Sequence, residues 1–344
     1  MDRNEAHQYL QQSLRHIKQR IMGQENVIEQ LICCFIAGGH ILMTGAPGLG
    51  KTLLVKVFSE YLGLSFGRIQ YTPDLLPSDI TGSEVIQFDD SQGKRHFEFI
   101  QGPIFSHLVL ADEINRASPR TQAAMLESMQ EGSVTYNGKT YQLPTPFMVC
   151  ATQNPFESEG TYPLPEAQLD RFLIHALVEH PNQNDELAIL KNYHTRASYL
   201  VEDNPEMNKT EVTKEHINTL ISHAEATKVS DEIFELVNSL VRATRKPLNH
   251  DGKEELSHLK VRFGAGPRGG LALITTAKSL AFLQGASEVR WHHIKKLACP
   301  VLRHRVSLHY NYAREFKNID DFLNQHMAQL ETNHHLKNII QAAS

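Results

Sequence analysis

At positions 45–52 the chain reads Gly45-Ala46-Pro47-Gly48-Leu49-Gly50-Lys51-Thr52, which matches the pattern G-x-x-x-x-G-K-[ST] without a mismatch. Such glycines let backbone N–H groups close around an anionic polyphosphate, and a helix dipole begins there with its positive end facing the same anion. We expect Lys51 to reach the β and γ phosphates and the hydroxyl of Thr52 to ligate Mg²⁺. The apolar run at 40–43 predicts a buried strand before the loop, and the apolar spacing over 52–58 predicts a helix after it. An ordinary glycine-rich turn would explain neither flank.

Length and composition limit the class of protein. The chain has 344 residues and a formal net charge of −5, so two domains are expected, with no general attraction to nucleic acid or anionic lipid. The basic stretch Arg303-His304-Arg305 is best explained as a solvated face or a phosphate contact. No apolar stretch is long enough to span a bilayer, and the first residues carry no secretory signal. The four cysteines include no C-x-x-C pair, which favours reduced thiols and a cytoplasmic location.

The pattern along the chain changes near Pro181. Before it, short apolar runs around 41, 108–110, 147–150 and 173–174 alternate with helical stretches, which is typical of a mostly parallel sheet covered by helices on both faces. After it, strand-like runs disappear and helical patterns remain. We therefore predict an α/β core over residues 1–182 and a smaller, all-helical domain over residues 183–344.

Two hairpins are predicted to interrupt the core. Asn137-Gly138 lies between two strand-like runs within 133–143 and is a strong type I′ turn signal. The second hairpin, over 84–99, has a longer loop. Exposed hairpins on an α/β core often bind partners, but they can also cover a sheet edge or a neighbouring subunit, and the sequence does not decide between these uses.

An acidic pair follows the apolar run at 107–111. Asp112 and Glu113 would emerge at the carboxyl end of a strand, where open α/β sheets bind their ligands. We expect Asp112 to hold Mg²⁺, directly or through water, and Glu113 to act as the general base on the attacking water. A solvated acidic pair is the alternative, and the phosphate loop upstream makes it the weaker one.

Three further residues complete a candidate catalytic set. Asn154 stands just past the apolar run at 147–152, where it could bind a γ-phosphate or simply form a turn before Pro155. Arg171 lies at the end of the predicted core and Arg268 at the opening of a helix in the predicted helical domain. Arginine stabilises phosphoryl charge through its rigid fork of donors. The alternatives are an intramolecular ion pair for Arg171 and an ordinary surface residue for Arg268.

With these motifs in place, the chain resembles the AAA+ ATPases and, within them, the MoxR family. The match is dense from about Ile21 to Pro181 and thinner beyond. It includes Met22-Gly23-Gln24, the segment Arg68-Ile69-Gln70-Tyr71-Thr72-Pro73-Asp74-Leu75-Leu76-Pro77-Ser78-Asp79-Ile80-Thr81-Gly82, and Gly102-Pro103-Ile104-Phe105. It continues through Ala111-Asp112-Glu113-Ile114-Asn115-Arg116-Ala117, Ala151-Thr152-Gln153-Asn154-Pro155 and the stretch from Glu159 to Phe172.

The resemblance implies roles that spacing alone does not. Met22 and Gly23 would join the phosphate loop in binding ATP or ADP, and Asn154 would be sensor 1. Arg171 would be the arginine finger that acts in trans on ATP bound by the adjacent subunit, and Arg268 would be sensor 2, on a lid that has Gly266 where serine is usual. The hairpins would be the helix-2 and pre-sensor-1 insertions of this clade. The resemblance also implies hexameric rings and clients that carry a von Willebrand factor A domain.

The leading hypothesis is a Mg²⁺-dependent AAA+ ATPase that remodels or matures partner proteins, with ATP between core and lid at a subunit interface. A nucleic-acid remodelling motor is the second hypothesis, and the acidic net charge weighs against it. A nucleotide-gated scaffold with negligible turnover is the third, and it is the weakest because every expected catalytic position is filled.

Overall fold

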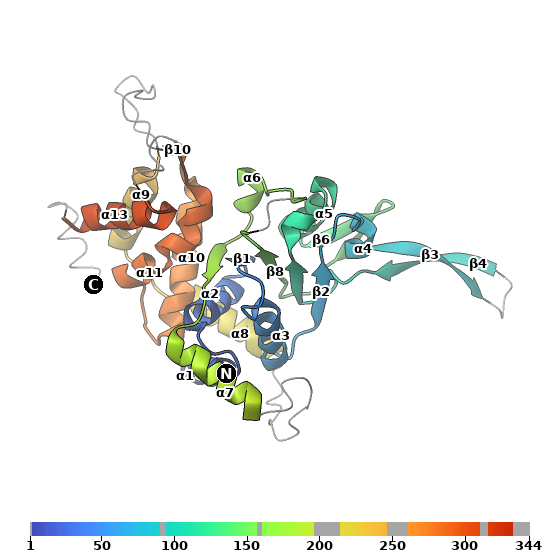
Figure 1. The fold of residues 1–344 in the computed structure, drawn as a ribbon, viewed down its shortest axis with the longest axis horizontal. Coiled ribbons are helices and arrows are strands. Elements are labelled where there is room, and N and C mark those ends of the chain that lie inside the picture. The colour runs from blue at the N-terminus through green and yellow to red at the C-terminus, as the bar shows by residue number, and fades with distance from the viewer. Residues whose placement is uncertain are drawn as a thin grey trace.

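The structure is a computed structural model that describes residues 2–89, 94–156, 160–195, 214–245, 261–309 and 316–332. Its centre is a five-stranded sheet in the order β2-β5-β8-β1-β9 (Figure 1). Every pairing in this sheet is parallel. The strands are β1 (Ile41–Gly45), β2 (Phe66–Gln70), β5 (Leu108–Asp112), β8 (Met148–Gln153) and β9 (Ile174–Val178).

Successive residues of the strands face opposite sides of the sheet. Leu108 and Leu110 pack with the helices α1 (Arg3–Arg20), α2 (Glu25–Ile36) and α3 (Lys51–Tyr61). Val109 and Ala111 pack on the other side with α5 (Pro119–Glu131). Since a parallel sheet buries both faces, its inner strands are largely apolar. The predicted α/β core with a sheet between helices is confirmed.

Strand β2 was not among the predicted strands. It reads Phe66-Gly67-Arg68-Ile69-Gln70 and alternates between buried and exposed positions. It is an edge strand, so it lacks the continuous apolar run of the inner strands. The short helices α4 (Pro77–Thr81), η1 (Ile114–Arg116) and α6 (Glu166–Leu169) lie in the connections between strands.

Both predicted hairpins are present, and they pack on each other. The longer one is β3 (Gly82–Asp89) with β4 (Lys94–Gln101), and the shorter is β6 (Ser133–Tyr136) with β7 (Lys139–Gln142). Residues 90–93 of the longer loop lie outside the described residues. Asn137 and Gly138 both have positive φ, at 48° and 77°, as a type I′ turn requires. The ring of Phe99 stacks on that of Tyr141 with centroids 4.3 Å apart. The longer hairpin extends well away from the sheet (Figure 1).

The C-terminal part is helical. It contains α7 (Gln183–Thr195), α8 (Lys214–Glu225), α9 (Asp231–Ala243), α10 (Pro267–Leu283), α11 (Trp291–Leu302), η3 (Arg303–Arg305) and α13 (Ile319–Thr332). One short antiparallel pair, β10 (Val261–Phe263) with β11 (Ser307–Leu308), is an addition that the sequence did not predict. For Arg303-His304-Arg305 a solvated face or a phosphate contact was expected, and the solvated face is wrong because His304 and Arg305 are buried.

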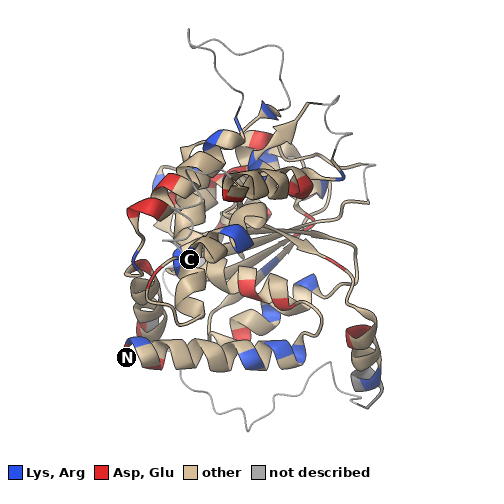
Figure 2. Ribbon diagram, turned by 90° about the vertical axis from the view of Figure 1, so that its left-hand side faces the viewer, with Lys and Arg blue, Asp and Glu red and all other residues tan. Residues whose placement is uncertain are grey.

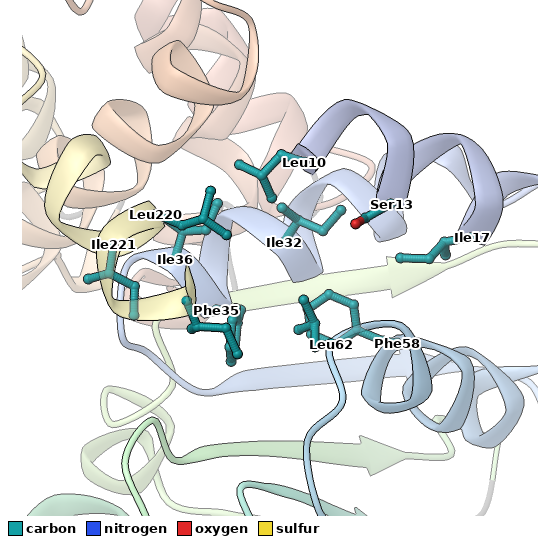
Figure 3. Close-up of a pocket in the computed structure, with 11 residues that line it drawn as sticks. Leu10, Ser13, Ile17, Ile32, Phe35, Ile36, Phe58, Leu62, Leu220 and Ile221 are labelled. Atoms are coloured by element: carbon teal, nitrogen blue, oxygen red, sulfur yellow. The ribbon is translucent and has the colours of Figure 1, made fainter. Parts of the chain in front are cut away.

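The N-terminal helices join the two parts. Buried residues of α1 and α2 belong to the same apolar cluster as those of α8, α10 and α11. A small cavity of about 10 Å³ lies where α1, α2, α3 and α8 meet (Figure 3). Its lining is apolar apart from Ser13, and it meets α3 at Phe58, far from the first residue of that helix, Lys51. We therefore regard it as a packing defect and not as a ligand site.

Charge and hydropathy add two findings. Figure 2 shows Lys and Arg interspersed with Asp and Glu along the coloured helices, without a basic stripe on this face. This distribution gives no support to a nucleic-acid motor. No helix among the described residues combines the length and the apolar content needed to cross a membrane.

His40, which precedes β1, links the sheet to α5. Its Nε2–H donates to the carbonyl of Met129 (3.1 Å), and its Nδ1 accepts from the N–H of Val149 (3.0 Å). Burial lowers the pKa of His40 to about 4. A proton on Nδ1 would remove the acceptor that Val149 uses, so the folded protein holds the neutral ring.

We expect His40 to make the protein acid-sensitive. Its pKa is about 6.5 in an unfolded chain and about 4 when folded. The neutral His40 ring therefore contributes about 3 kcal/mol to the free energy of unfolding above pH 6.5. This contribution is lost as the pH falls towards 4. Urea unfolding between pH 7 and pH 4 should show a flatter pH dependence for His40→Gln than for wild type. The exposed His180→Gln is the control, and an unchanged slope in His40→Gln would contradict the assignment.

Candidate functional site

The phosphate loop connects β1 to α3 as the sequence predicts. Gly48 and Gly50 have positive φ, at 82° and 77°, a conformation that glycine adopts without strain. A Cβ built on either glycine meets nothing within 4 Å, so the space over the loop is open. Gly50 is the N-cap of α3, and the helix begins at Lys51. The free N–H groups of that first turn and the open loop fit a bound polyphosphate.

Lys51 folds back over this loop. Its Nζ donates to the carbonyls of Gly45 (2.6 Å) and Ala46 (2.8 Å). Burial lowers the pKa of Lys51, and the negative charges of Asp112 and Glu113 act in the opposite direction. The ammonium group is thus held at the loop, within electrostatic reach of both predicted acids.

Asp112 collects three donors at the end of β5. It is 8 % exposed. Its Oδ2 accepts from Thr52 Oγ1 (3.3 Å) and Arg68 Nη2 (2.9 Å), and its Oδ1 accepts from Thr152 Oγ1 (2.7 Å). The structure therefore brings together Thr52 and Asp112, the predicted ligands of Mg²⁺. Among the described residues no three His, Cys, Asp or Glu side chains gather as a metal site. A hydroxyl and a carboxylate beside a phosphate loop fit Mg²⁺, which takes few protein ligands together with phosphate oxygens.

Glu113 has an unusual backbone conformation. Its φ of 58° and ψ of 50° are left-handed, which is uncommon outside glycine. Its N–H donates to Thr152 Oγ1 (2.9 Å). Its carboxylate oxygen Oε2 accepts from Gln70 Nε2 (3.0 Å) and pairs with Arg116 Nε (3.1 Å). Strained residues held by several neighbours are found at functional sites, and here the neighbours fix the direction of one carboxylate.

Sequence reasoning assigned no role to Arg68, Gln70 or Thr152. Gln70 is paired in register with Asp112 across β2 and β5, and Ala151 is paired with Ala111 across β8 and β5. These pairings bring the carboxyl ends of three strands together. A polar residue that ends an apolar run, as Thr152 does, was the available signal for one of them.

Asn154 lies one residue beyond β8 and is buried. Its Oδ1 accepts from the N–H of Phe156 (3.1 Å), which is the turn-forming use of asparagine. The carbonyl of the amide therefore serves the turn. A phosphate oxygen needs a donor, and the NH₂ group of the same amide could supply it.

Met22 and Gly23 lie between α1 and α2, against the segment that follows β9. A Cβ on Gly23 would come within 2.6 Å of Cβ of Pro181. A Cβ on Gly45 would likewise come within 2.4 Å of the carbonyl oxygen of Val178. The end of β9 contacts the start of the phosphate loop, and Pro181 just beyond it contacts Gly23, which brings these predicted binding residues to one edge of the sheet.

Arg171 and Arg268 lie elsewhere. Arg171 precedes β9, and the register pairs Ile41 with Ile174 and Gly45 with Val178. Arg171 is therefore at the amino end of the strand and the phosphate loop at the carboxyl end, about 13 Å or more apart along the strand direction. The guanidinium of Arg171 has no hydrogen bond or ion pair within the described ranges, which disfavours the intramolecular ion pair. Arg268 Nη1 lies 3.6 Å from Asp170 Oδ2, beside Arg171. The structure does not bring Arg268 to its own phosphate loop.

Comparison with known proteins identifies both parts of the chain. The family described as ATPase family associated with various cellular activities (AAA) matches residues 40–174, and the AAA lid domain matches residues 253–325. The uncharacterized protein YeaC of Bacillus subtilis is 40 % identical over 306 residues, which cover 89 % of each chain. Chaperone MoxR1 of Mycobacterium tuberculosis is 38 % identical over 88 % of this chain and 76 % of its own.

A solved structure agrees with these relatives. The crystal structure of a proposed ATPase from Cytophaga hutchinsonii superposes with a TM-score of 0.78 at 33 % identity, and covers 94 % of this chain and 96 % of its own. The match extends over the sheet, the hairpins and the helical part together. The phosphate loop, the acidic end of β5 and the matched lid domain all agree with these relatives. The chain belongs to the MoxR family of AAA+ ATPases.

Proposed function

We propose that this protein hydrolyses ATP with Mg²⁺ and uses the cycle to remodel or mature partner proteins. The observation that carries the proposal is the meeting of Lys51, Thr52, Asp112 and Glu113 at the carboxyl edge of the sheet. These residues provide a phosphate ligand, two metal ligands and a base, which are the parts that hydrolysis of a nucleoside triphosphate needs.

Binding would use the phosphate loop and the two oxygen ligands. Thr52 and Asp112 would hold Mg²⁺, which neutralises charge on the phosphates when bound. Lys51 would exchange its bonds to the Gly45 and Ala46 carbonyls for phosphate oxygens. Burial lowers the pKa of Lys51, and the negative charges of Asp112 and Glu113 partly oppose that effect.

Glu113 would accept the proton of the attacking water. Thr152 positions its backbone, while Gln70 and Arg116 hold its carboxylate. A base acts only within hydrogen-bond reach of the proton that it takes, so this fixed direction matters more than its strength. The NH₂ group of Asn154 would orient the water or the γ-phosphate.

The two distant arginines support a ring in which subunits complete one another. Arg171 precedes β9 and so lies away from its own phosphate loop. Arg268 contacts Asp170, the residue that directly precedes Arg171. We infer that one subunit offers Arg171 to the ATP of the next in a homo-oligomer, which the family resemblance suggests is a hexamer. An arginine that acts in trans couples hydrolysis to the arrangement of the ring.

The proposed clients are proteins with a von Willebrand factor A domain. Support comes from the family resemblance and from a relative named as a chaperone, Chaperone MoxR1 of Mycobacterium tuberculosis.

Affinity capture with a slow-hydrolysis variant tests the client proposal. Glu113→Gln with ATP and Mg²⁺ should hold a client that the matched bait Lys51→Ala does not hold, because only the first can stay loaded with ATP. We expect the specifically retained proteins to include one with a von Willebrand factor A domain. Identical retention by both baits, or a specific set without such a domain, would contradict the proposal.

A further inference from the structure

The basic stretch Arg303-His304-Arg305 is buried between the helical part and the core. It forms η3, directly after α11. The side chain of Arg305 is only 4 % exposed. A charged side chain is rarely buried unless it is paired and hydrogen-bonded. Its partners therefore indicate what this segment does.

Apart from one carbonyl of α11, those partners belong to the segment 170–173, which contains Arg171. Arg305 Nε donates to Asp170 Oδ1 (2.8 Å), and its Nη2 donates to the carbonyls of Phe172 (2.7 Å) and Asp170 (3.3 Å). Its Nη1 donates to the carbonyl of Leu173 (3.2 Å). One guanidinium thus holds the backbone on both sides of Arg171.

Two further contacts tighten this attachment. His304 Nε2 donates to the same Phe172 carbonyl (2.9 Å), so neighbouring residues of η3 hold one peptide group. Arg305 Nη1 also donates to the carbonyl of Val301 in α11, which anchors the guanidinium to the helical part. The backbone around Arg171 is therefore attached to the lid, and not only to the sheet.

Asp170 connects this buried anchor to an exposed arginine. Its Oδ1 accepts from Arg305, and its Oδ2 lies 3.6 Å from Nη1 of Arg268. The side chain of Arg268 is 72 % exposed. Asp170 therefore lies between the anchor and Arg268, and it directly precedes Arg171. One carboxylate is in a position to set where the guanidinium groups of Arg171 and Arg268 project.

We propose that Asp170 and Arg305 are positioning residues that hold Arg171 and Arg268 in the arrangement presented to the neighbouring subunit. The proposal rests on the proposed function of Arg171 in trans. Because Arg305 belongs to the lid and Arg171 to the core, the lid and the arginine finger of one subunit move together. The lid of each subunit thereby sets the catalytic competence of the next ATP site in the ring.

Asp170→Asn is the appropriate test because it keeps the shape of the side chain and an acceptor for Arg305 Nε while it removes the charge. A misplacement of about 1 Å at a catalytic group can cost up to about 100-fold in rate. We expect kcat for ATP hydrolysis to fall by about 10-fold or more, with KM for ATP within about twofold of wild type. A merely structural role would change KM and thermal stability together with kcat.

Mixed rings allow the two sides of an interface to be tested separately. The giving side is the subunit that supplies Arg171, and the receiving side is the subunit that binds the ATP. Lys51→Ala subunits keep Arg171 but bind ATP only weakly, and Arg171→Ala subunits bind ATP but offer no finger. Asp170→Asn added to the Lys51→Ala subunit should lower the rescued activity of the mixture by about 10-fold. The same change added to the Arg171→Ala subunit should leave the rescued activity within about twofold of the mixture without Asp170→Asn. Asp320→Asn, which alters the neighbouring pair with Arg303 (2.6 Å), is the matched control and should have no effect on either side.

The outcomes are distinct. Equal losses on the two sides, or no loss on the giving side, would overturn the positioning role while the trans role stands. If the parent mixture without Asp170→Asn shows no rescue, the proposed trans function fails and this inference fails with it. Loss of folding is recognised by thermal unfolding of each variant, and Arg305→Lys, which keeps the charge but not the fork of donors, then provides the second test on the giving side.

Discussion

Glu113→Gln is expected to bind ATP about as tightly as wild type and to hydrolyse it about 100-fold more slowly or worse, the usual effect of losing a general base. Glutamine keeps an oxygen that can accept from Gln70 and Arg116, which contact a single carboxylate oxygen of Glu113. The left-handed backbone of Glu113, held by Thr152, is unaffected by the exchange. The local geometry therefore persists, and what disappears is the ability to take a proton from water.

Phosphate release in Mg²⁺, with nucleotide binding followed separately, measures this effect. Lys51→Ala should instead weaken ATP binding by about 10- to 100-fold, as expected for a lost charge-assisted hydrogen bond. Glu131→Gln makes the same chemical change at an exposed position at the end of α5 and should behave as wild type. Removal of Mg²⁺ with EDTA should abolish hydrolysis by wild type. Turnover by Glu113→Gln close to the wild-type rate would remove the base assignment.

The sequence predicts the parts of this site that are contiguous in the chain. The phosphate loop and the acidic end of β5 are each contained in one short stretch with apolar flanks, so local pattern was sufficient. Arg68, Gln70 and Thr152 could not be found in that way. They reach Asp112 and Glu113 from other strands, and only the strand order and register bring them there.

The stretch Arg303-His304-Arg305 shows the opposite limit. Its charge favoured a solvated face or a phosphate contact, but the structure buries His304 and Arg305 against the segment around Arg171. A sequence shows that a side chain is charged and not which carbonyl groups it meets. The same limit applies to Arg268, whose neighbour is Asp170 and not the phosphate loop of its own subunit.

Arg171→Ala is expected to bind ATP normally and to lose hydrolysis by about 1,000-fold or more, the range found for arginine fingers. Arg171 lies just before the amino end of β9, whereas the phosphate loop follows the carboxyl end of the paired strand β1. Its removal should therefore leave the ATP site of its own subunit intact. The stability of the fold should hardly change, because Arg171 is half-buried and has no ion pair within the described ranges. A normal rate in Arg171→Ala, measured as phosphate release at saturating ATP, would contradict the assignment.

The most direct measurement is the ATPase rate of mixtures of Arg171→Ala and Lys51→Ala subunits, each nearly inactive alone. If subunits mix at random in a ring, about one quarter of the interfaces at a 1:1 ratio combine an intact phosphate loop with a neighbour's intact Arg171. The account predicts a rate that rises to as much as about a quarter of wild type near equal amounts and falls to either side. A rate that stays at the level of the separate variants at every ratio, in rings shown to exchange subunits, would contradict it.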